Sequence, residues 1–345
     1  MSVARRDLVA RILPEGLPAL WCPPITHYDR HGGIDRARTE THLNRIAPHV
    51  GGLLLAGSTG DGWDLPHALH REIITQGLAA ARSHSLSVLV GVLRPNAREA
   101  SREIIRLARE LTGAAEGLSA TSLLSVRGVC GFTVCPSVGV ERDPEALSDC
   151  LRALFRTGVP LALYQLPQVT GYELTPPHVA NLGLEFSNFV FFIDSSGRDA
   201  VVARPPLPED VLLLRGAEGN YSRWLSLAGG PYHGLILSSA NCFARELASI
   251  VDNLKKGRIE EARGMSARIT LLMNDLFEAV AGMTVGNPFA NANKATDHFM
   301  AFGPKAESTD PPSLTGGAVM PQEIIRLTGD ILERHGFLPQ RGYLE

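Results

Sequence analysis

Lysine is scarce in this chain. Of its 345 residues, only Lys255, Lys256, Lys294 and Lys305 are lysines, and arginine supplies the rest of the basic charge. Since no lysine stands before residue 255, no side-chain imine can form in the preceding part of the chain. The formal net charge of −3 argues against the basic surface that a nucleic-acid partner needs, so we predict no such partner.

Long apolar runs and paired cysteines are missing as well. No run approaches the roughly 18–20 apolar residues of a membrane span, and the N-terminal stretch has too few apolar residues for a signal peptide. The five cysteines are odd in number and lack metal-ligand spacing, which indicates reduced thiols in a cytoplasmic protein. We therefore predict no membrane contact, and a short surface helix at the N-terminus.

Short apolar runs alternate with longer amphipathic segments over most of the chain. Each apolar run predicts a strand and each amphipathic segment a helix. Eight such units indicate a closed (β/α)8 TIM barrel over residues 1–240, and an open doubly wound sheet is the alternative. The predicted strands, some with their loops, are residues 17–24, 51–60, 86–92, 131–136, 160–167, 189–193, 211–216 and 233–241.

After the eighth strand the pattern becomes purely helical. Residues 241–345 are expected to form a helical extension packed on the barrel. The Gly/Ala/Ser-rich stretch 112–128 is interpreted as an extension or insertion before the fourth strand, and its pattern assigns it no structure. The helices predicted in the extension are residues 243–254, 259–281, 288–302 and 321–335.

Functional residues of such a barrel come from the carboxyl ends of its strands. One strand ends in Ser58, Thr59 and Gly60, flanked by glycine, where backbone N–H groups and hydroxyls can converge on a carboxylate. A tight turn without a ligand is the alternative. Tyr164 ends a buried strand, where it is either a proton shuttle or a buried ring bonded to a neighbour.

Three motifs, taken together and in order, resemble the dihydrodipicolinate synthase and N-acetylneuraminate lyase family. Gly57–Asp61 is similar to G-S/T-T-G-E/D, and Tyr164–Gly171 to Y-x-x-P-x-x-T-G. Asp194–Gly197 is similar to the end of a K-D-S-S-G strand. The resemblance runs from about Leu17 to Leu338. It implies a (β/α)8 barrel that acts on pyruvate or another 2-oxo acid, and assembles as a homotetramer or homodimer.

The same resemblance implies roles for individual residues. Ser58 and Thr59 are expected to hold the substrate carboxylate, and Tyr164 to relay protons at the reacting carbon. The family's nucleophile is a strand-six lysine that forms an imine with the ketone. That position falls on Ile193, or on Asp194 if the alignment contains a one-residue gap, and neither side chain can form an imine.

Two further departures separate this chain from the synthases of the family. They carry an arginine in the strand-five motif where this chain has Val169, which argues against aspartate semialdehyde as a second substrate. They also carry an aromatic pair after the strand-four proline, and one member of this pair completes the proton relay. Ser137 and Val138 stand there instead, so the relay is expected to be incomplete.

Without the lysine, a metal ion or a hydrogen-bonding oxyanion hole must stabilise a carbanion next to a ketone. No His-x-His or Glu-x-x-His spacing occurs, so no metal and no cofactor are predicted. Glu218 is interpreted as a base or an amine-binding group, with a helix N-terminal charge as the alternative. Cys135 is expected to be a buried inert thiol, and Lys294 to have a surface or helix-capping role. The predicted substrate-binding set is Ser58, Thr59, Gly60, Ile193, Asp194, Glu218 and Ser238, and the predicted catalytic pair is Tyr164 and Ser58.

Two functions remain compatible with the sequence. One is a lyase, hydratase or isomerase that acts on a small 2-oxo or hydroxy acid without a lysine imine. The other is a catalytically silent relative that binds a small carboxylate or a partner subunit. The joint presence of the strand-two hydroxyls and Tyr164 favours the enzyme, because stability alone would accept many other residues at these positions.

Overall fold

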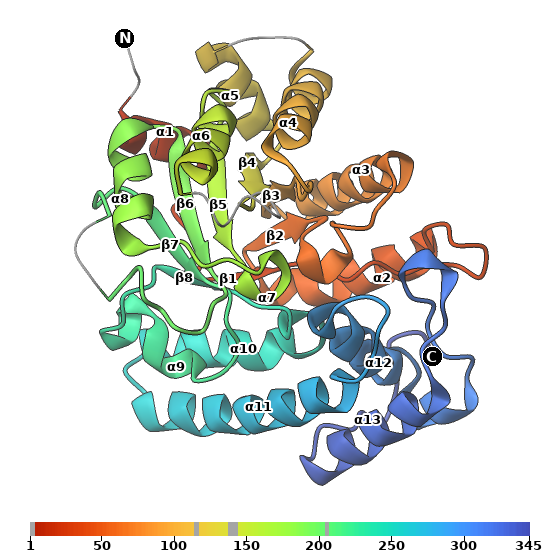
Figure 1. Ribbon diagram of the computed structural model, residues 1–345. Helices are drawn as coiled ribbons and strands as arrows, with labels where there is room; N and C mark the ends of the chain where they lie inside the picture. The colour runs from red at the N-terminus through yellow and green to blue at the C-terminus, as the bar shows by residue number, and fades with distance from the viewer. Residues whose placement is uncertain (1–3, 114–116, 137–143, 204–206) are drawn as a thin grey trace.

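The structure is a computed structural model that describes residues 4–113, 117–136, 144–203 and 207–345 (Figure 1). Eight parallel strands pair in sequence order, and pairing of the first with the last closes the sheet into a barrel. The predicted (β/α)8 fold is confirmed. The strands are β1 Leu20–Cys22, β2 Gly52–Leu55, β3 Ser87–Gly91, β4 Val129–Val134, β5 Leu161–Gln165, β6 Phe189–Asp194, β7 Leu212–Arg215 and β8 Gly234–Ile236.

Helices surround the barrel and cover its outer face (Figure 1). The stretch 112–128, to which the sequence assigned no structure, contains the helix α5. None of the helices in the described ranges is long and apolar enough to cross a membrane. The covering helices are α2 Arg36–Ile46, α3 His67–Ser83, α4 Ala97–Thr112, α5 Gly117–Val126, α6 Pro144–Phe155, α8 Pro176–Glu185, α9 Tyr221–Trp224 and α10 Ala240–Lys255. The short helix α7, Pro167–Thr170, follows the carboxyl end of β5.

Strand β6 shows how the sequence builds the wall of the barrel. Phe191 and Ile193 are fully buried in the inner apolar cluster, together with Trp21 and Leu54. Phe192 points the other way, into the apolar layer beneath the helices. Successive side chains of a strand alternate between its faces, so a strand buried on both faces is continuously apolar. Phe191 and Ile193, two residues apart, accordingly share the inner face of β6.

The N-terminal helix α1, Arg5–Ile12, closes the amino end of the barrel. Leu8 and Ile12 are buried in the same inner cluster as Trp21. Arg5 is buried too, and its guanidinium donates to the carbonyl of Phe186 at 2.8 Å. The predicted short surface helix is confirmed, since Arg6, Asp7, Ala10 and Arg11 are exposed, while the opposite side of α1 serves as the floor of the barrel.

The C-terminal region contains α11 Ile259–Val280, α12 Pro288–Phe302 and α13 Gln322–Arg334. Helix α10 packs on β1 and α2 as a barrel helix does, and α11 to α13 pack beyond it (Figure 1). Helix α12 is buried from Ala290 to Ala301, between α10, α11 and the turn that follows β2. A domain boundary at residue 240 stays a prediction, but α12 clearly reaches the carboxyl end of the barrel.

Candidate functional site

A cavity of about 20 Å³ lies at the carboxyl ends of the strands. A void of this size holds about one water molecule. A three-carbon acid would need more room than these walls leave, and none of the lining residues is a lysine. The lining residues are Pro23, Leu54, Thr59, Tyr164, Leu166, Ile193, Ser195, Gly216, Ile236, Ser238 and Phe289.

The strand-two motif contributes one residue to this cavity. Thr59 lines it, whereas Ser58 does not. The Ser58 hydroxyl is buried and has no hydrogen-bond partner among the described residues. Gly60 faces the loop after β1, since a Cβ there would lie 2.7 Å from the carbonyl oxygen of Pro24. The structure thus brings Thr59 to the cavity and leaves Ser58 beside it, with an unused donor.

The turn itself is a short 3-10 helix, Ser58–Gly60. Its hydrogen bonds begin with the Gly60 amide, which donates to the carbonyl of Gly57 at 3.0 Å. The amides of Ser58 and Thr59 precede that bond, as the first N–H groups of a helical turn do, and remain available to an anion. Asn287, at the start of α12, donates to the Ser58 carbonyl at 2.9 Å and holds the turn in place. The carboxylate cradle itself stays a prediction.

Lys294 was expected to have a surface or helix-capping role, and the surface position was wrong. Its side chain is only 2% exposed, and Nζ lies 2.6 Å from Oδ2 of Asp61. The Tyr28 hydroxyl donates to the same oxygen at 3.0 Å, and Nζ sits 4.7 Å from the centre of the Tyr28 ring. Burial lowers the pKa of Lys294, and the Asp61 carboxylate opposes the shift. Lys294 therefore fixes the end of the strand-two turn rather than lining the cavity.

Tyr164 lines the cavity, and its hydroxyl lies 3.4 Å from Oγ of Ser195. Burial raises the pKa of Tyr164 well above its ordinary value, so the side chain stays protonated at neutral pH. Ser195 donates to the phenol oxygen, which leaves the phenol O–H free to donate to a ligand. Sequence reasoning missed Ser195, although the two-residue period places it on the same face of the chain as Ile193.

Glu218 reaches the cavity indirectly. Oε1 accepts from Oγ of Ser238 at 2.8 Å and from the Ser239 amide at 2.9 Å. Oε2 accepts from Oγ of Ser239 at 2.7 Å and from the Tyr221 hydroxyl at 2.8 Å. Only Ser238 of this group lines the cavity. The carboxylate is therefore a hydrogen-bonded acceptor one residue removed from the cavity wall.

Asp194 lies on the opposite face of β6 and is fully buried. Its carboxylate accepts from Nε2 of Gln165 at 3.2 Å and from the Ser196 amide at 2.9 Å. The Tyr232 hydroxyl lies 3.4 Å from its second oxygen. The structure thus brings Ile193, and not Asp194, to the cavity.

Four further positions were singled out in the sequence: Val169, Cys135, Ser137 and Val138. Val169 packs against the inner apolar cluster. Cys135 is 6% exposed, and burial raises the pKa of its thiol, as expected for an inert cysteine. All five cysteines are free, as predicted. Ser137 and Val138 lie outside the described residues.

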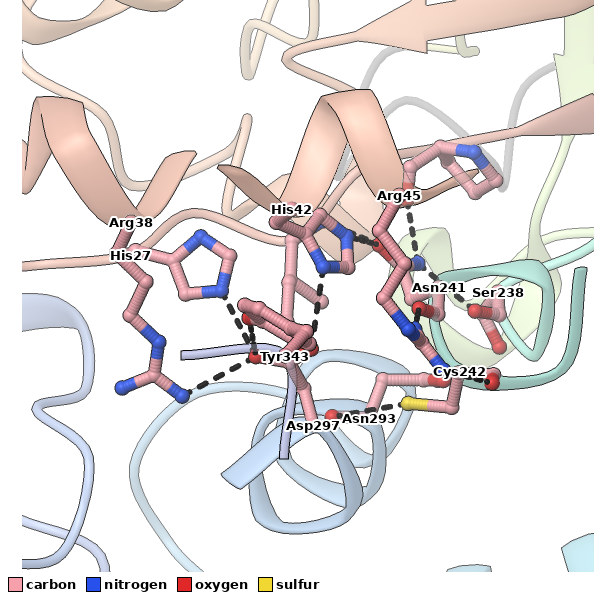
Figure 2. Close-up of polar contacts among 12 residues, drawn as sticks. His27, Arg38, His42, Arg45, Ser238, Asn241, Cys242, Asn293, Asp297 and Tyr343 are labelled. Carbon is pink, nitrogen blue, oxygen red and sulfur yellow. Dashed lines mark hydrogen bonds and ion pairs between the residues drawn. The ribbon is translucent and has the colours of Figure 1, made fainter. Parts of the chain in front are cut away.

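A second polar group, the Asp297 cluster, consists of His27, Arg38, His42, Asp297 and Tyr343. Figure 2 shows the other four side chains converging on Asp297. Nε2 of His27 and Nη2 of Arg38 lie 3.0 and 3.1 Å from Oδ2. Nδ1 of His42 lies 3.1 Å from Oδ1, and the Tyr343 hydroxyl lies 3.0 Å from Oδ2. Sequence reasoning missed this cluster entirely.

The same cluster could in principle bind a metal ion. The possible ligand atoms of His27, His42 and Asp297 lie within 4.8 Å of one another, a spacing that no other such group in the described ranges shows. However, Arg38 and Tyr343 already donate to the carboxylate. A divalent cation would add two positive charges next to a buried guanidinium, at a large cost in electrostatic free energy. The donor set fits protons better than a metal.

Comparisons with known proteins agree with this architecture. The sequence model of the dihydrodipicolinate synthetase family matches residues 18–290. A 4-hydroxy-tetrahydrodipicolinate synthase of Escherichia coli O139:H28 (strain E24377A / ETEC) is 26% identical over 261 residues, which cover 73% of this chain and 80% of the relative.

Solved structures resemble the fold over nearly the whole chain. A dihydrodipicolinate synthase from Aquifex aeolicus superposes with a TM-score of 0.67 at 18% identity, covering 94% of this chain and 100% of its own. The KD(P)GA of T. tenax gives 0.70 at 21% identity, covering 92% and 99%. CdNal from Clostridium difficile, solved with mannosamine, gives 0.70 at 15% identity, covering 93% and 99%. At these identities the likeness concerns the fold alone.

Proposed function

The chain belongs to the dihydrodipicolinate synthetase family, and we propose that it is a lyase-like member that acts on a small 2-oxo or hydroxy acid without a lysine imine. The observation that carries the proposal is the composition of the cavity wall. Ile193 takes part in a wall that also contains Thr59, Tyr164 and Ser238, and no amine is among the lining residues. Binding groups for a carboxylate thus accompany an apolar side chain where a nucleophile would be needed.

The strand-two turn would hold the substrate carboxylate. The donors in this proposal are the amides of Ser58 and Thr59, the unpaired hydroxyl of Ser58 and the hydroxyl of Thr59, a residue that lines the cavity. Hydrogen bonds to a charged acceptor contribute about 1.5–3 kcal/mol each. The hydrogen bond from Asn287 and the ion pair between Lys294 and Asp61 hold this turn in place, so little conformational entropy is lost when the anion binds.

Tyr164 would replace the imine as the electron sink. Its hydroxyl stays protonated because burial raises its pKa, and it can donate to the ketone oxygen as negative charge develops there. An apolar surrounding strengthens this hydrogen bond. Tyr164 would then act as an oxyanion donor, in place of the proton shuttle that the resemblance implies.

Ser238 and Glu218 would take up the proton. For a hydroxylated 2-oxo acid, the hydroxyl proton passes to Ser238 while the Ser238 proton passes to Glu218 at 2.8 Å. The carbon–carbon bond breaks, and its electron pair moves to the ketone oxygen as an enolate that Tyr164 stabilises. The proton held by Glu218 is then returned to the enolate carbon.

A second candidate is a catalytically silent member that binds a small carboxylate or a partner subunit. The size of the cavity favours it, because about 20 Å³ accommodates one water molecule and no 2-oxo acid. Phe289 of α12 would have to move before any substrate enters. Assembly as a homotetramer or homodimer and a cytoplasmic location are part of the proposal for either candidate.

Titration with pyruvate and assays with a panel of hydroxy-2-oxo acids test the proposal. We expect reversible pyruvate binding that weakens in Thr59→Val, a variant of similar shape without the hydroxyl. Borohydride should add no mass in the presence of pyruvate, because reduction traps only an imine. Turnover of any acid in the panel identifies an enzyme, and binding without turnover identifies the silent member. A borohydride-dependent adduct would refute the imine-free mechanism.

A further inference from the structure

The side-chain amide of Asn241 has only one possible orientation. Its nitrogen lies 2.9 Å from the carbonyl of Pro23 and 2.8 Å from the carbonyl of Ser238, so it must be the NH₂ group. Its oxygen accepts from the Ile25 amide at 2.9 Å. Nε2 of His42 lies 3.1 Å from that same oxygen, so Nε2 of His42 carries a proton and donates it (Figure 2).

The other ring nitrogen of His42 faces Asp297. Nδ1 lies 3.1 Å from Oδ1 of the carboxylate. Burial would raise the pKa of Asp297, but the charge of His42 and the hydrogen bonds from His27 and His42 outweigh it and hold that pKa well below the usual range. An ionised carboxylate can only accept hydrogen bonds, so Nδ1 must donate. Both ring nitrogens of His42 thus face acceptors, an arrangement that a doubly protonated imidazolium fits.

Other charged and titratable groups surround this pair. Nη2 of Arg38 lies 3.1 Å from Oδ2 of Asp297, and the Tyr343 hydroxyl donates to the carboxylate. Burial lowers the pKa of His27 to about 4, so His27 is a neutral donor through Nε2. The guanidinium of Arg45 lies 5.5 Å from the centre of the Tyr343 ring. Arg38 balances the charge of Asp297, so a neutral His42 would face the carboxylate with an unpaired lone pair.

We propose that the His42–Asp297 pair positions the wall of the cavity. Asp297 orients His42, His42 orients the Asn241 oxygen, and the Asn241 nitrogen holds the carbonyls of Pro23 and Ser238, both of which line the cavity. This inference rests on the proposed function, in which Ser238 takes up the substrate proton. His42 and Asp297 touch no substrate and are positioning residues.

The relay connects elements that are far apart in the sequence. Asp297 belongs to α12, and His42, 255 residues earlier, belongs to α2. Asn241 belongs to the first turn of α10, directly after β8. Since α12 also carries Lys294 to Asp61, the same helix braces both polar sides of the cavity.

Nitrogen-15 NMR of the full chain at neutral pH tests the protonation directly. Both ring nitrogens of His42 should show proton-bound shifts in the wild type, and only Nε2 in Asp297→Asn. The side-chain amide protons of Asn241 should exchange with solvent at least about tenfold faster in Asp297→Asn, because they lose their oriented support. A wild-type His42 with one protonated nitrogen would overturn the imidazolium assignment.

Pyruvate titration of the same proteins tests the positioning. Asp297→Asn should weaken binding by about tenfold or more, and Tyr343→Phe, which leaves the His42–Asp297 pair intact, by less than about twofold. His42→Gln retains a donor toward Asn241 and should fall between them. Asn241 exchange that is unchanged in Asp297→Asn would overturn the relay, even if pyruvate does not bind the wild type. Absence of pyruvate binding together with the expected exchange would instead refute only the proposed function.

Discussion

The cavity and the Asp297 cluster lie close together, and they differ in how fully one central polar group of each is paired, the Ser58 hydroxyl beside the cavity and the Asp297 carboxylate in the cluster. Asp297 accepts hydrogen bonds from four side chains. Ser58, beside the cavity, has a buried hydroxyl without a partner in the described part of the chain. Buried polar groups are nearly always paired within a stable fold. The fully bonded Asp297 carboxylate therefore belongs to the framework, although Nδ1 of His27 and Nε of Arg38 have no partner among the described residues. The unpaired Ser58 hydroxyl remains available to a ligand.

The largest effect is expected from Asp297→Ala, because the Asp297 cluster then loses its central acceptor. Asp297→Ala leaves the Arg38 guanidinium and the His42 ring buried without an anion. Breaking a buried charge pair lowers the free energy of unfolding by about 3–5 kcal/mol. Denaturant titration measures the loss. Tyr343→Phe removes one donor and keeps the carboxylate, so it should cost no more than about 1.5 kcal/mol. Equal losses for the two variants would contradict a cluster organised by Asp297.

Acidification should destabilise the protein next. Burial lowers the pKa of His27 from 6.5 to about 4, so the folded chain holds His27 neutral. The contribution of the neutral His27 ring to the free energy of unfolding is complete above pH 6.5. It is lost as the pH falls toward 4, by up to about 3 kcal/mol. His70, bonded to the Gly91 carbonyl, has the same shift and adds to the effect. Unfolding free energies at pH 7 and pH 4 should converge in the double variant His27→Gln/His70→Gln. An unchanged pH dependence would exclude these rings as its source.

Placing an amine in the cavity wall tests whether the cavity binds a 2-oxo acid. Ile193→Lys should cost about 1–3 kcal/mol of stability, because a longer side chain enters a packed wall. Burial would lower the pKa of the new amine and leave part of it neutral and nucleophilic at pH 7. Mass spectrometry should then detect a borohydride-trapped pyruvate adduct in this variant, and none in the apolar control Ile193→Met. A folded lysine variant that resists trapping would show that the cavity does not bind a 2-oxo acid.

The smallest effect on stability is expected at the unpaired hydroxyl. Ser58→Ala removes a buried group that has no partner among the described residues, so the free energy of unfolding should change by less than about 0.5 kcal/mol. Pyruvate affinity should nevertheless fall roughly tenfold, because a donor to the carboxylate is lost. Thr133→Val removes another buried, unpaired hydroxyl on β4, away from the cavity lining, and should leave affinity unchanged. Equal affinities in all three proteins would rule out the cradle.

Local sequence patterns sufficed for the barrel and for part of the site. The apolar run that ends at Asp194 predicted β6 because a parallel strand is buried on both faces and turns polar only where it ends. Thr59, Tyr164 and Ser238 were predicted at the carboxyl ends of their strands, and the structure brings them to one cavity. The two-residue period of β6 places Ile193 in the cavity wall and Asp194 on the opposite face, which the Asp194–Gly197 motif alone did not decide.

Long-range pairing could not be predicted from the same patterns. A lone lysine in a helix is typical of a solvent-exposed position, and the burial of Lys294 depends on Asp61, 233 residues away. His42 and Asp297 were missed for the same reason. Helix α5, with the sequence GLSATSLLSV, carries no charged residue to mark a polar face, so its composition resembled a loop.

Helix α12 has a consequence for the order in which this protein is made. The strands of the barrel leave the ribosome first, and Asp61 then lacks the lysine that follows 233 residues later on α12. His42 is synthesised 255 residues before Asp297, whose carboxylate it contacts. The Lys294–Asp61 and Asp297–His42 contacts at the carboxyl end of the barrel therefore form together, when α12 docks on the barrel. A nascent chain that stops short of α12 would have its eight strands but an unfinished cavity, so the site would form only after α12 has been synthesised.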